Sequence, residues 1–524
     1  PPLEPEYTVW TEGGTYGRVR SGFTAGGTKD NFGYTVNGNI IRDDGWRERT
    51  SIEEKAISAK GVWQVSPYTK VTLRGEYQEQ FNEQPGSLTS EEFLENWRQA
   101  SVYDTYEEDS FATISGSLEH QFSEMSNAKI AYSGRKSTNE GPTALSYKSG
   151  YVDEVSIDHS LLAQYQQKFG YLSSKLVVGT DLQYSDNREK SYVWDTGDAE
   201  HGPLNKDWNL LAITGAPFAQ LQFSPVKWAE VTLGGRYDYI NYTGTDKFGD
   251  KGELEAEFQN LSKKAGVSFA VNDKTTLWFG YGEAFVAPSR TYLFSSTASY
   301  SNYTHNYSGY NADPNLDPET AKNYSVGLRG TLAKGVFGYD VSLYHTDIKD
   351  MVVGVDRGGG LDGRVYVNAG NIRGQGLETS FYVKPNDMLR FDAGYTYAIN
   401  KYTDFVDGDN DYTGNYVVSS PLHHLNARVT VTPIKNLDIE LEWDHISEFY
   451  TSNANDDPNG QYQRPDLWHL KVNYEDGPWE YWGQARNLTD VKYADSVSYS
   501  ARNHDRSYGP GNGRTFMAGA KYKF

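Results

Sequence analysis

The chain has 524 residues, including 41 tyrosines and 52 glycines, and only 37% of its residues are hydrophobic. Its 49 basic and 70 acidic residues give a net charge of −21, which argues against a nucleic-acid partner because phosphate binding needs surplus Lys and Arg. It has no cysteine, which excludes disulfides, thiolate metal sites and iron–sulfur clusters. No run of 18 apolar residues predicts a transmembrane helix.

Period-two alternation of apolar and polar residues marks the segments 71–78, 231–239, 389–397, 425–432 and 437–444 as strands. On a helix the same apolar residues would scatter around the axis. A strand with one apolar and one wet face suits a soluble all-β protein, and it also suits a transmembrane barrel, whose lipid face uses every second residue. The last segment alternates apolar Leu437, Ile439, Leu441 and Trp443 with acidic Asp438, Glu440, Glu442 and Asp444.

Short turns alternate with long polar segments along the whole chain. This alternation is typical of an outer-membrane barrel, which has short turns at one end and long loops at the other. The sequence therefore predicts an all-β fold: a transmembrane antiparallel β-barrel of about 22 strands, with short periplasmic turns and long extracellular loops. A soluble array of β-sandwiches or a propeller is the alternative. The long loops are expected near residues 79–109, 135–155, 186–209, 243–257, 286–322, 402–415, 451–462 and 496–512.

The last strand and the distribution of aromatic residues support the barrel. Phe516, Ala518, Ala520, Tyr522 and Phe524 share one face of the C-terminal segment. A terminal aromatic on such a strand resembles the signal that outer-membrane proteins present to their insertion machinery. Aromatics near the ends of other strands suit the girdles at the two membrane interfaces. These are Trp10, Trp46, Trp63, Trp228, Tyr242, Trp479 and Trp482.

Motifs in the second half of the chain make the prediction more specific. Residues 282–289, 311–330, 367–381, 485–495 and 509–524 resemble, in order and spacing, the motifs of TonB-dependent receptors. These receptors are the gated outer-membrane importers of Gram-negative bacteria. Each motif alone is weak, but together and in order they are specific.

The resemblance implies that residues 1–524 form the barrel domain of such a receptor. Residues 6–27 look like the first hairpin of the barrel, so the plug domain of the family is expected to be absent and would precede residue 1. In the family the plug fills the lumen and carries the contact to the TonB–ExbB–ExbD complex. Outer-membrane lipid and lipopolysaccharide are the other expected partners, and we expect a monomer.

The resemblance also implies import of a scarce, bulky nutrient, most often a ferric siderophore. Iron arrives coordinated by its chelator, so we expect no cofactor, no metal ligands and no catalytic residues in the chain itself. Segments 43–50 and 81–105 resemble loops of ferric citrate and carboxylate-siderophore receptors. Arginines in these loops would pair with ligand carboxylates, and clustered tyrosines would supply contact area. The candidate ligand-binding residues are Arg47, Trp97, Arg98, Arg290, Tyr292, Tyr300, Tyr303, Tyr307 and Tyr310.

Other ligands stay open. A haem receptor could use one or two histidines of its outer loops, and of the ten dispersed histidines only His305 and His504 clearly fall in predicted outer loops. Cobalamin receptors use calcium held by acidic outer loops. Residues 407–411 carry alternating aspartates, but they lack the Gly and closing Glu of a complete calcium loop. A receptor for another metal chelate is a further alternative.

Two other classes of function are an open channel and an enzyme. A constitutively open, porin-like diffusion channel would fold one loop inward as a constriction with opposed charge clusters. The motifs at 311–319 and 485–493 argue against it. An enzyme is not expected, because the sequence has no G-x-S-x-G elbow, no H-E-x-x-H and no phosphate-binding loop.

Overall fold

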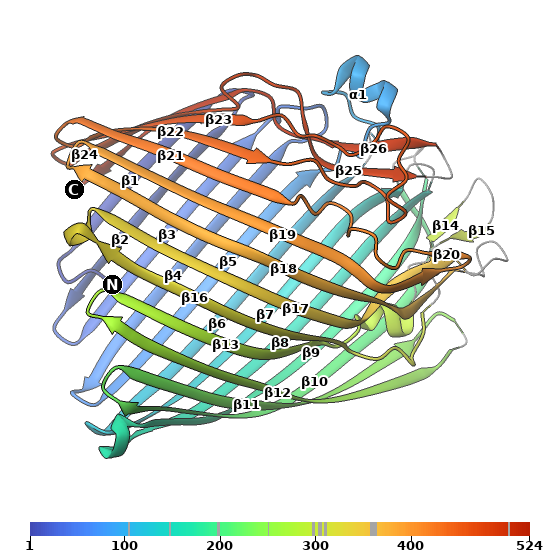
Figure 1. Cartoon of the computed structure of the whole chain (residues 1–524). Coiled ribbons are helices and arrows are strands. Elements are labelled where there is room, and N and C mark those ends of the chain that lie inside the picture. The colour runs from blue at the N-terminus through green and yellow to red at the C-terminus, as the bar shows by residue number, and fades with distance from the viewer. Residues whose placement is uncertain are drawn as a thin grey trace.

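The computed structural model shows a closed antiparallel β-barrel of 22 strands, which confirms the predicted fold class (Figure 1). The first and last wall strands, β1 and β27, pair with each other over seven residues and close the ring. The two-residue strand β20 pairs only with the end of β19 and is not part of the ring. No helix among the described residues is long and apolar enough to cross a membrane. The structure describes residues 1–102, 105–145, 148–195, 200–249, 251–295, 299–301, 306–308, 312–356, 364–500 and 504–524.

The wall strands run in chain order around the barrel. They are β1 (Glu6–Gly14), β2 (Val19–Lys29), β3 (Phe32–Asp43), β4 (Ile52–Ser66), β5 (Thr69–Glu83), β6 (Tyr106–Ser123), β7 (Ser126–Leu145), β8 (Lys148–Lys168), β9 (Lys175–Asp195), β10 (Glu200–Val226), β11 (Ala229–Asp246), β12 (Glu253–Asn272), β13 (Thr275–Val286), β16 (Glu319–Leu332), β17 (Phe337–Asp356), β18 (Arg364–Asn386), β19 (Leu389–Asp407), β21 (His423–Ile434), β22 (Leu437–Ile446), β23 (Leu467–Asp476), β24 (Trp479–Arg486) and β27 (Thr515–Lys523).

The remaining elements lie in the connections. They are α1 (Ser90–Asn96), the π-helical turn η2 (Thr291–Ser295), the 3₁₀ turns η1 (Tyr171–Ser173) and η3 (Ala333–Gly335), and the short strands β14 (Ser299–Ser301), β15 (Asn306–Ser308), β20 (Asn410–Asp411), β25 (Ala494–Ser500) and β26 (Asp505–Pro510).

Connection length sorts by barrel end, as predicted. The termini and the short turns lie at one end, and α1, β20 and the β25–β26 hairpin lie at the other (Figure 1). Three of the expected long loops are wrong, because most of 243–257, 135–155 and 186–209 belongs to wall strands. Only 247–252 connects β11 to β12, and the other two segments are strand almost throughout. There β7 to β10 continue as paired strands of 20 to 27 residues. Beyond the apolar band both faces of a strand meet water, so the sequence there has no alternation to reveal it.

The outer face of the wall carries the apolar band that a membrane requires. Exposed Trp63, Trp228 and Trp479 lie on this face near the short turns, as predicted. Nine residue steps separate exposed Tyr68 from exposed Tyr77, which is about 30 Å along a strand and about 23 Å along an axis tilted by ~40°. That height is close to the ~25 Å apolar band of outer-membrane barrels.

Four of the predicted girdle aromatics lie elsewhere. Tyr242 packs against the hydrophobic cluster on the lumen side of β10 to β12. Trp46 is 8% exposed in a loop. Trp10 and Trp482 face the lumen, and each ring lies over a glycine of the neighbouring strand, Gly22 and Gly519, where a Cβ would overlap it. Alternation places an aromatic near a strand end, but only the register tells which face it takes.

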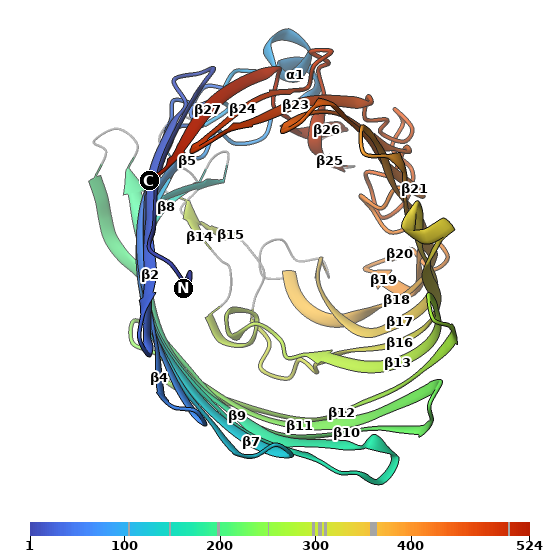
Figure 2. The ribbon, with the colours of Figure 1, turned by 90° about the vertical axis from the view of Figure 1, so that its left-hand side faces the viewer.

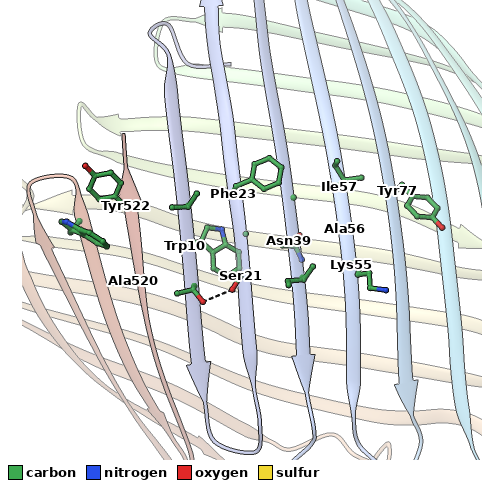
Figure 3. Close-up of a pocket in the computed structure, with 16 residues that line it drawn as sticks. Trp10, Ser21, Phe23, Asn39, Lys55, Ala56, Ile57, Tyr77, Ala520 and Tyr522 are labelled. Atoms are coloured by element: carbon green, nitrogen blue, oxygen red, sulfur yellow. Dashed lines mark hydrogen bonds between the residues drawn. The ribbon is translucent and has the colours of Figure 1, made fainter.

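A large apolar hollow opens on the outer face. One register row, Val9–Phe23–Gly38–Ile57–Tyr77, crosses five strands there (Figure 3). The Phe23 ring lies over Gly38, and the row lines a groove of about 750 Å³. The groove faces the region that hydrocarbon occupies, so it is not a site for a water-soluble ligand.

The lumen face is polar and its charges are mostly paired. In β1, Thr8 and Glu12 point inward and are buried, while Tyr7 and Val9 point outward and are exposed. The chain begins on this inner side, where Thr28 Oγ1 donates to the Pro2 carbonyl at 2.7 Å (Figure 2). Ion pairs between neighbouring residues cover the inner wall. Examples are Arg18–Asp43, Arg74–Glu76, Arg236–Asp238, Arg390–Asp392 and Lys521–Glu480.

The seam that closes the ring generates a testable prediction. Trp482 Nε1 donates to Glu12 Oε2 at 2.8 Å, and its ring lies over Gly519 of the strand between them. We expect Gly519→Ala to displace the ring and destabilise the barrel by about 1–3 kcal/mol. Gly483→Ala on neighbouring β24 is the matched control, because its nearest neighbour would be 3.9 Å away. Electrophoresis of the folded barrel after graded heating measures the unfolding temperature of both variants. Equal unfolding temperatures would contradict this role of Gly519.

Candidate functional site

The end of the barrel opposite the termini has the features of a functional site. Its loops make two structures. Residues 44–51, 84–102, 447–466 and, in the fourth loop, 487–500 and 504–514 pack together on one side and form what we call the loop platform. Residues 287–295, 299–301, 306–308 and 312–318, which we call the inner loop, lie inside the ring of strands (Figure 2).

The loop platform has its own hydrophobic core. Thr89 and Glu92 form a reciprocal capping box that starts α1, and Phe93 of this helix stacks on Tyr508 of β26 with ring centroids 4.5 Å apart. The Ser90 hydroxyl donates to Asp505 of the same hairpin. The buried residues of this core are Leu88, Phe93, Phe449, Tyr462, Ala494 and Val497.

Arg47 holds two loops of the platform together. Its side chain donates from Nε to the Gln99 carbonyl at 2.8 Å and from NH1 to the Gly86 carbonyl at 2.9 Å. The residue is 5% exposed, and burial lowers the pKa of its guanidinium. Arg47 therefore bonds to the backbone of the loops and offers no exposed donor to a ligand. Its contact with a ligand stays a prediction.

The side chains of Trp97 and Arg98 differ in how much of their surface is exposed to a ligand. The Trp97 ring packs on Trp46, with centroids 5.0 Å apart, and is half-buried. Arg98 is exposed, and its guanidinium lies over the Tyr16 ring at 4.9 Å. Of the three platform residues predicted to bind, only Arg98 offers an exposed cation at the mouth.

A buried ion pair joins the third and fourth loops of the platform. Arg506 Nε lies 2.6 Å from Asp457 Oδ2, and the two side chains are 8% and 3% exposed. Thr451 Oγ1 donates to the same oxygen at 2.6 Å, and Arg506 NH2 donates to the Gly460 carbonyl at 2.7 Å. Burial alone would raise the pKa of Asp457, but these hydrogen bonds outweigh it and the pKa lies below its usual range.

The inner loop packs on the lumen side of the wall. Leu293 and Phe294 are fully buried in it, and a Cβ at Gly244 of β11 would overlap the Phe294 ring. The loop is folded inward, which is the feature expected of the diffusion-channel alternative. Its core also contains wall residues from β10 to β12 and β18: Trp208, Leu210, Ile240, Ala256, Phe258 and Tyr366, with Leu316 of the loop.

The predicted residues of this loop have different positions. Arg290 donates to the Leu210 carbonyl and, from NH2 at 3.2 Å, to Ser185 Oγ. Tyr292 stacks on Tyr366 with centroids 4.2 Å apart. Tyr300 and Tyr307 pair through their backbones in the β14–β15 hairpin. Tyr303 and Tyr310 lie outside the described residues.

Three residues that were not predicted organise the mouth, and all belong to motifs that carry the family resemblance. Asn368 bonds to both the backbone N–H and the carbonyl of Asp317. Asn487, 2% exposed, bonds across its own loop to Val491 and Asn512. Glu319 accepts from the backbone N–H of Val352 at 2.8 Å. The motifs gave the signal, but without the fold they do not say what these side chains hold.

No metal centre is formed by the residues that the structure describes, since nowhere do three His, Asp or Glu side chains group to hold an ion. Asp407 pairs with Asn410 in the tight β19–β20 turn, and Asp411 accepts from the Thr413 backbone. His423 and His424 point to opposite faces, bonded to Tyr395 outside and Asp444 inside. The described residues at this end thus offer a cation and aromatic rings as contacts, and hold no group of metal ligands.

The comparison with known families decides the identity. The sequence matches the family described as "TonB dependent receptor-like, beta-barrel" over residues 4–508. The chain belongs to the TonB-dependent receptor family. Members of this family are outer-membrane transport receptors, so the barrel crosses the outer membrane.

Individual receptors are similar to parts of the chain. The ferrioxamine B receptor of Salmonella typhimurium is 23% identical over 251 residues, which cover 44% of this chain and 31% of that receptor. The ferric-pyoverdine receptor PbuA of Pseudomonas sp. strain M114 is 24% identical over 248 residues, covering 44% and 26%. The matched part thus spans under a third of the length of either receptor.

Solved TonB-dependent receptors share the fold over the whole barrel. The unliganded ferric citrate transporter FecA superposes with a TM-score of 0.83 at 18% identity and covers 100% of this chain and 79% of its own. The siderophore receptor PiuA from Acinetobacter baumannii gives 0.80 at 13%, covering 99% and 82%. At these identities the likeness shows the fold alone.

The ion pair in the platform of this receptor barrel predicts a pH response. We expect Asp457→Asn to release loop 447–466 from loop 487–514, because removing one partner of a buried pair costs about 3–5 kcal/mol. Since the folded pKa of Asp457 lies below the ordinary value of 3.8, the stabilisation is complete above that value and is lost as the pH falls through the folded pKa.

Limited proteolysis of the outer loops measures this response. The wild-type platform should resist cleavage at neutral pH and become sensitive only well below pH ~4, while Asp457→Asn should be cleaved at both. Asp456→Asn is the control, because Asp456 is exposed and bonds only within its own loop, to Ser452. A variant that is cleaved no faster than the control at neutral pH would contradict the role of the pair.

Proposed function

We propose that the chain is the barrel of a receptor that imports a ferric siderophore, energised by the TonB complex through a plug domain in the lumen. The observation that carries the proposal is the family match along almost the whole chain. The names of the similar receptors, for ferrioxamine B and for ferric pyoverdine, support a ferric chelate as the ligand.

The width and polarity of the lumen favour the presence of a plug domain. A ring of 22 strands is wide enough for a plugged lumen. Ion pairs lie on its inner wall, and in one group, Lys70–Glu119–Lys129, the charges alternate in sign across β5, β6 and β7. A polar wall of this kind suits a wet, reversible contact with a domain that must move, better than a permanent hydrophobic interface would.

The side chains at the mouth favour a bulky ligand. Arg98 offers a cation and Trp97 and Tyr16 offer aromatic surface beside it, on a platform fixed by its own core. We infer that a carboxylate chelate, if it is the ligand, contacts Arg98 and not Arg47, because Arg47 is 5% exposed and its Nε and NH1 donate to loop carbonyls. Haem, cobalamin and other chelates stay predictions.

An open diffusion channel is the second candidate, because the inner loop is folded into the lumen as that function requires. The two candidates differ in their need for energy. A diffusion channel passes small solutes down their gradient even in cells without TonB. A receptor cannot concentrate its ligand in such cells.

Uptake of radioactive iron tests the proposal. The full receptor, expressed in a Gram-negative host without its own siderophore receptors, should import iron from at least one ferric chelate in a panel of hydroxamate, catecholate and carboxylate types. Uptake should stop when TonB is deleted. Uptake that persists without TonB, or no uptake from any chelate, would contradict the proposal.

Arg98→Ala tests the carboxylate contact. If the imported chelate is a carboxylate type, loss of one charge-assisted hydrogen bond should weaken binding by about tenfold or more. Arg42→Ala is the matched control, because Arg42 is also exposed but lies on the outer face of β3. Isothermal titration with the ferric chelate measures both, and equal affinities would remove Arg98 from the binding surface.

A further inference from the structure

We propose that the loop between β3 and β4, residues 44–51, fixes the position of Arg98 at the mouth, with Arg47 and Glu48 as the positioning residues. The inference rests on the proposed function, in which Arg98 contacts a carboxylate-bearing ligand, and it names the residues that give this contact its place. It also assigns to Arg47 an indirect role in binding, in place of the predicted direct contact.

Arg98 carries a charge that no carboxylate of the described residues balances. Its exposed guanidinium lies over the half-buried Tyr16 ring at 4.9 Å. A guanidinium on an aromatic face keeps N–H groups for an acceptor, and a carboxylate matches the geometry of its fork. Other arginines at this end are paired with acidic residues: Arg18 with Asp43, Arg49 with Glu83, Arg506 with Asp457 and Arg514 with Asp490.

The β3–β4 loop bonds to three successive backbone positions that begin at Arg98. The Glu48 backbone N–H donates to the Arg98 carbonyl at 2.9 Å. Arg47 Nε donates to the carbonyl of the next residue, Gln99, at 2.8 Å. The backbone N–H of Ala100 then donates to Glu48 Oε2 at 3.2 Å. Because these bonds fix the backbone on the C-terminal side of Arg98, they fix the direction in which its side chain leaves the loop.

Arg47 also closes the loop that carries Arg98. From NH1 it donates at 2.9 Å to the carbonyl of Gly86, on the opposite arm of this loop from Gln99. The Ser101 backbone N–H donates to the Pro85 carbonyl at 2.9 Å and joins the same two arms. The remaining nitrogen of Arg47, NH2, is buried. A ligand at the surface therefore does not reach Arg47, which acts on binding through the backbone that it holds.

The same β3–β4 loop holds the aromatic neighbours of Arg98. The Asp44 backbone N–H donates to the Tyr16 carbonyl at 3.0 Å, which ties the β1–β2 turn to the loop. Trp46 packs on Trp97, the residue before Arg98, with ring centroids 5.0 Å apart. One loop thus positions both the cation and the ring on which the cation lies.

The β3–β4 loop is itself rigid. The Thr50 hydroxyl donates to the Arg47 carbonyl at 2.6 Å. Gly45 has a φ of 86°, and a Cβ there would overlap Thr50. The Gly45 backbone N–H donates to Asp43 Oδ1 at 2.9 Å. Such a loop presents Arg98 in one place before any ligand arrives, which lowers the cost of ordering the site on binding.

The absence of cysteine allows a direct test by spin labelling at single sites. Arg98→Cys carries the reporter, and Leu94→Cys, 75% exposed on α1, carries a reference label in the same connection. Electron paramagnetic resonance of the labelled barrel in membranes measures the mobility of each label. Arg47→Ala and Glu48→Ala should each shift the label at position 98 from an immobilised to a mobile spectrum.

The label at position 94 should keep its spectrum in both variants. The helix α1 is held by its own capping box and by the stacking of Phe93 on Tyr508, not by the β3–β4 loop. A label at 94 that becomes mobile together with the label at 98 would indicate a general loosening of the platform and would overturn the positioning role.

Two further variants separate the hydrogen bonds from the charges. Glu48→Gln keeps an acceptor for the Ala100 N–H and should keep the label at 98 immobilised, unlike Glu48→Ala. Arg49→Ala is the matched control for Arg47→Ala, because Arg49 belongs to the same loop but pairs with Glu83 of β5. A spectrum at 98 that is equal in Arg47→Ala, Glu48→Ala and Arg49→Ala would overturn the proposal.

A double-mutant cycle tests whether Arg47 acts through Arg98. With ferric citrate as the probe, titration of the full receptor should show that Arg47→Ala weakens binding about as much as Arg98→Ala does. Arg47→Ala should cause no further loss in the Arg98→Ala background, because the two residues act as one unit. Additive losses would overturn the proposal. Absence of ferric citrate binding would contradict the carboxylate class of ligand, and the spin labels, which need no ligand, decide the positioning role separately.

Discussion

Closure of the sheet between β1 and β27 is the constraint on which the rest of the structure depends. Within hydrocarbon no backbone N–H or C=O can be left unpaired, and a closed ring is the only sheet without edges. The seam is short, seven residue pairs, and Trp482 reinforces it by reaching across Gly519 to Glu12. Once the ring is closed, alternation fixes an apolar outside and a polar inside for every strand.

The two ends of the barrel differ in how the chain connects the strands. At the end with the termini, tight turns such as Asn436 with φ of 66° and Gly477 with φ of 57° return the chain directly. At the other end the chain is free of the bilayer and builds two structures of its own. The loop platform is stabilised by an outer hydrophobic core and the Arg506–Asp457 pair, and the inner loop is stabilised by the lumen wall.

The fold could be predicted from the sequence for those strand segments that have one face toward hydrocarbon and the other toward water. Segments such as 437–444 show their two faces in their residues, and the structure confirms them as strands. The upper parts of β7 to β10 could not be predicted, because both faces there meet water and the alternation disappears. The face of Trp10 depended on register, which sequence alone does not give.

The site was harder to predict than the fold. Arg47 was expected at a ligand, yet its environment is made by Gly86 and Gln99, residues 39 and 52 positions away. Asn368 was not expected, although it bonds to Asp317 across 51 positions. A side chain whose partners come from distant loops has a role that only the folded molecule reveals. The motifs of the family correctly marked the segments, and their residues proved to hold loops in place.

Conductance across a planar bilayer tests the central claim that this ring of strands is a receptor wall built around a movable plug. The barrel alone is predicted to give a large, weakly selective conductance. Addition of the separately prepared plug domain of the same receptor is predicted to close it. A conductance that stays unchanged with the plug present would contradict the account and favour an open diffusion channel.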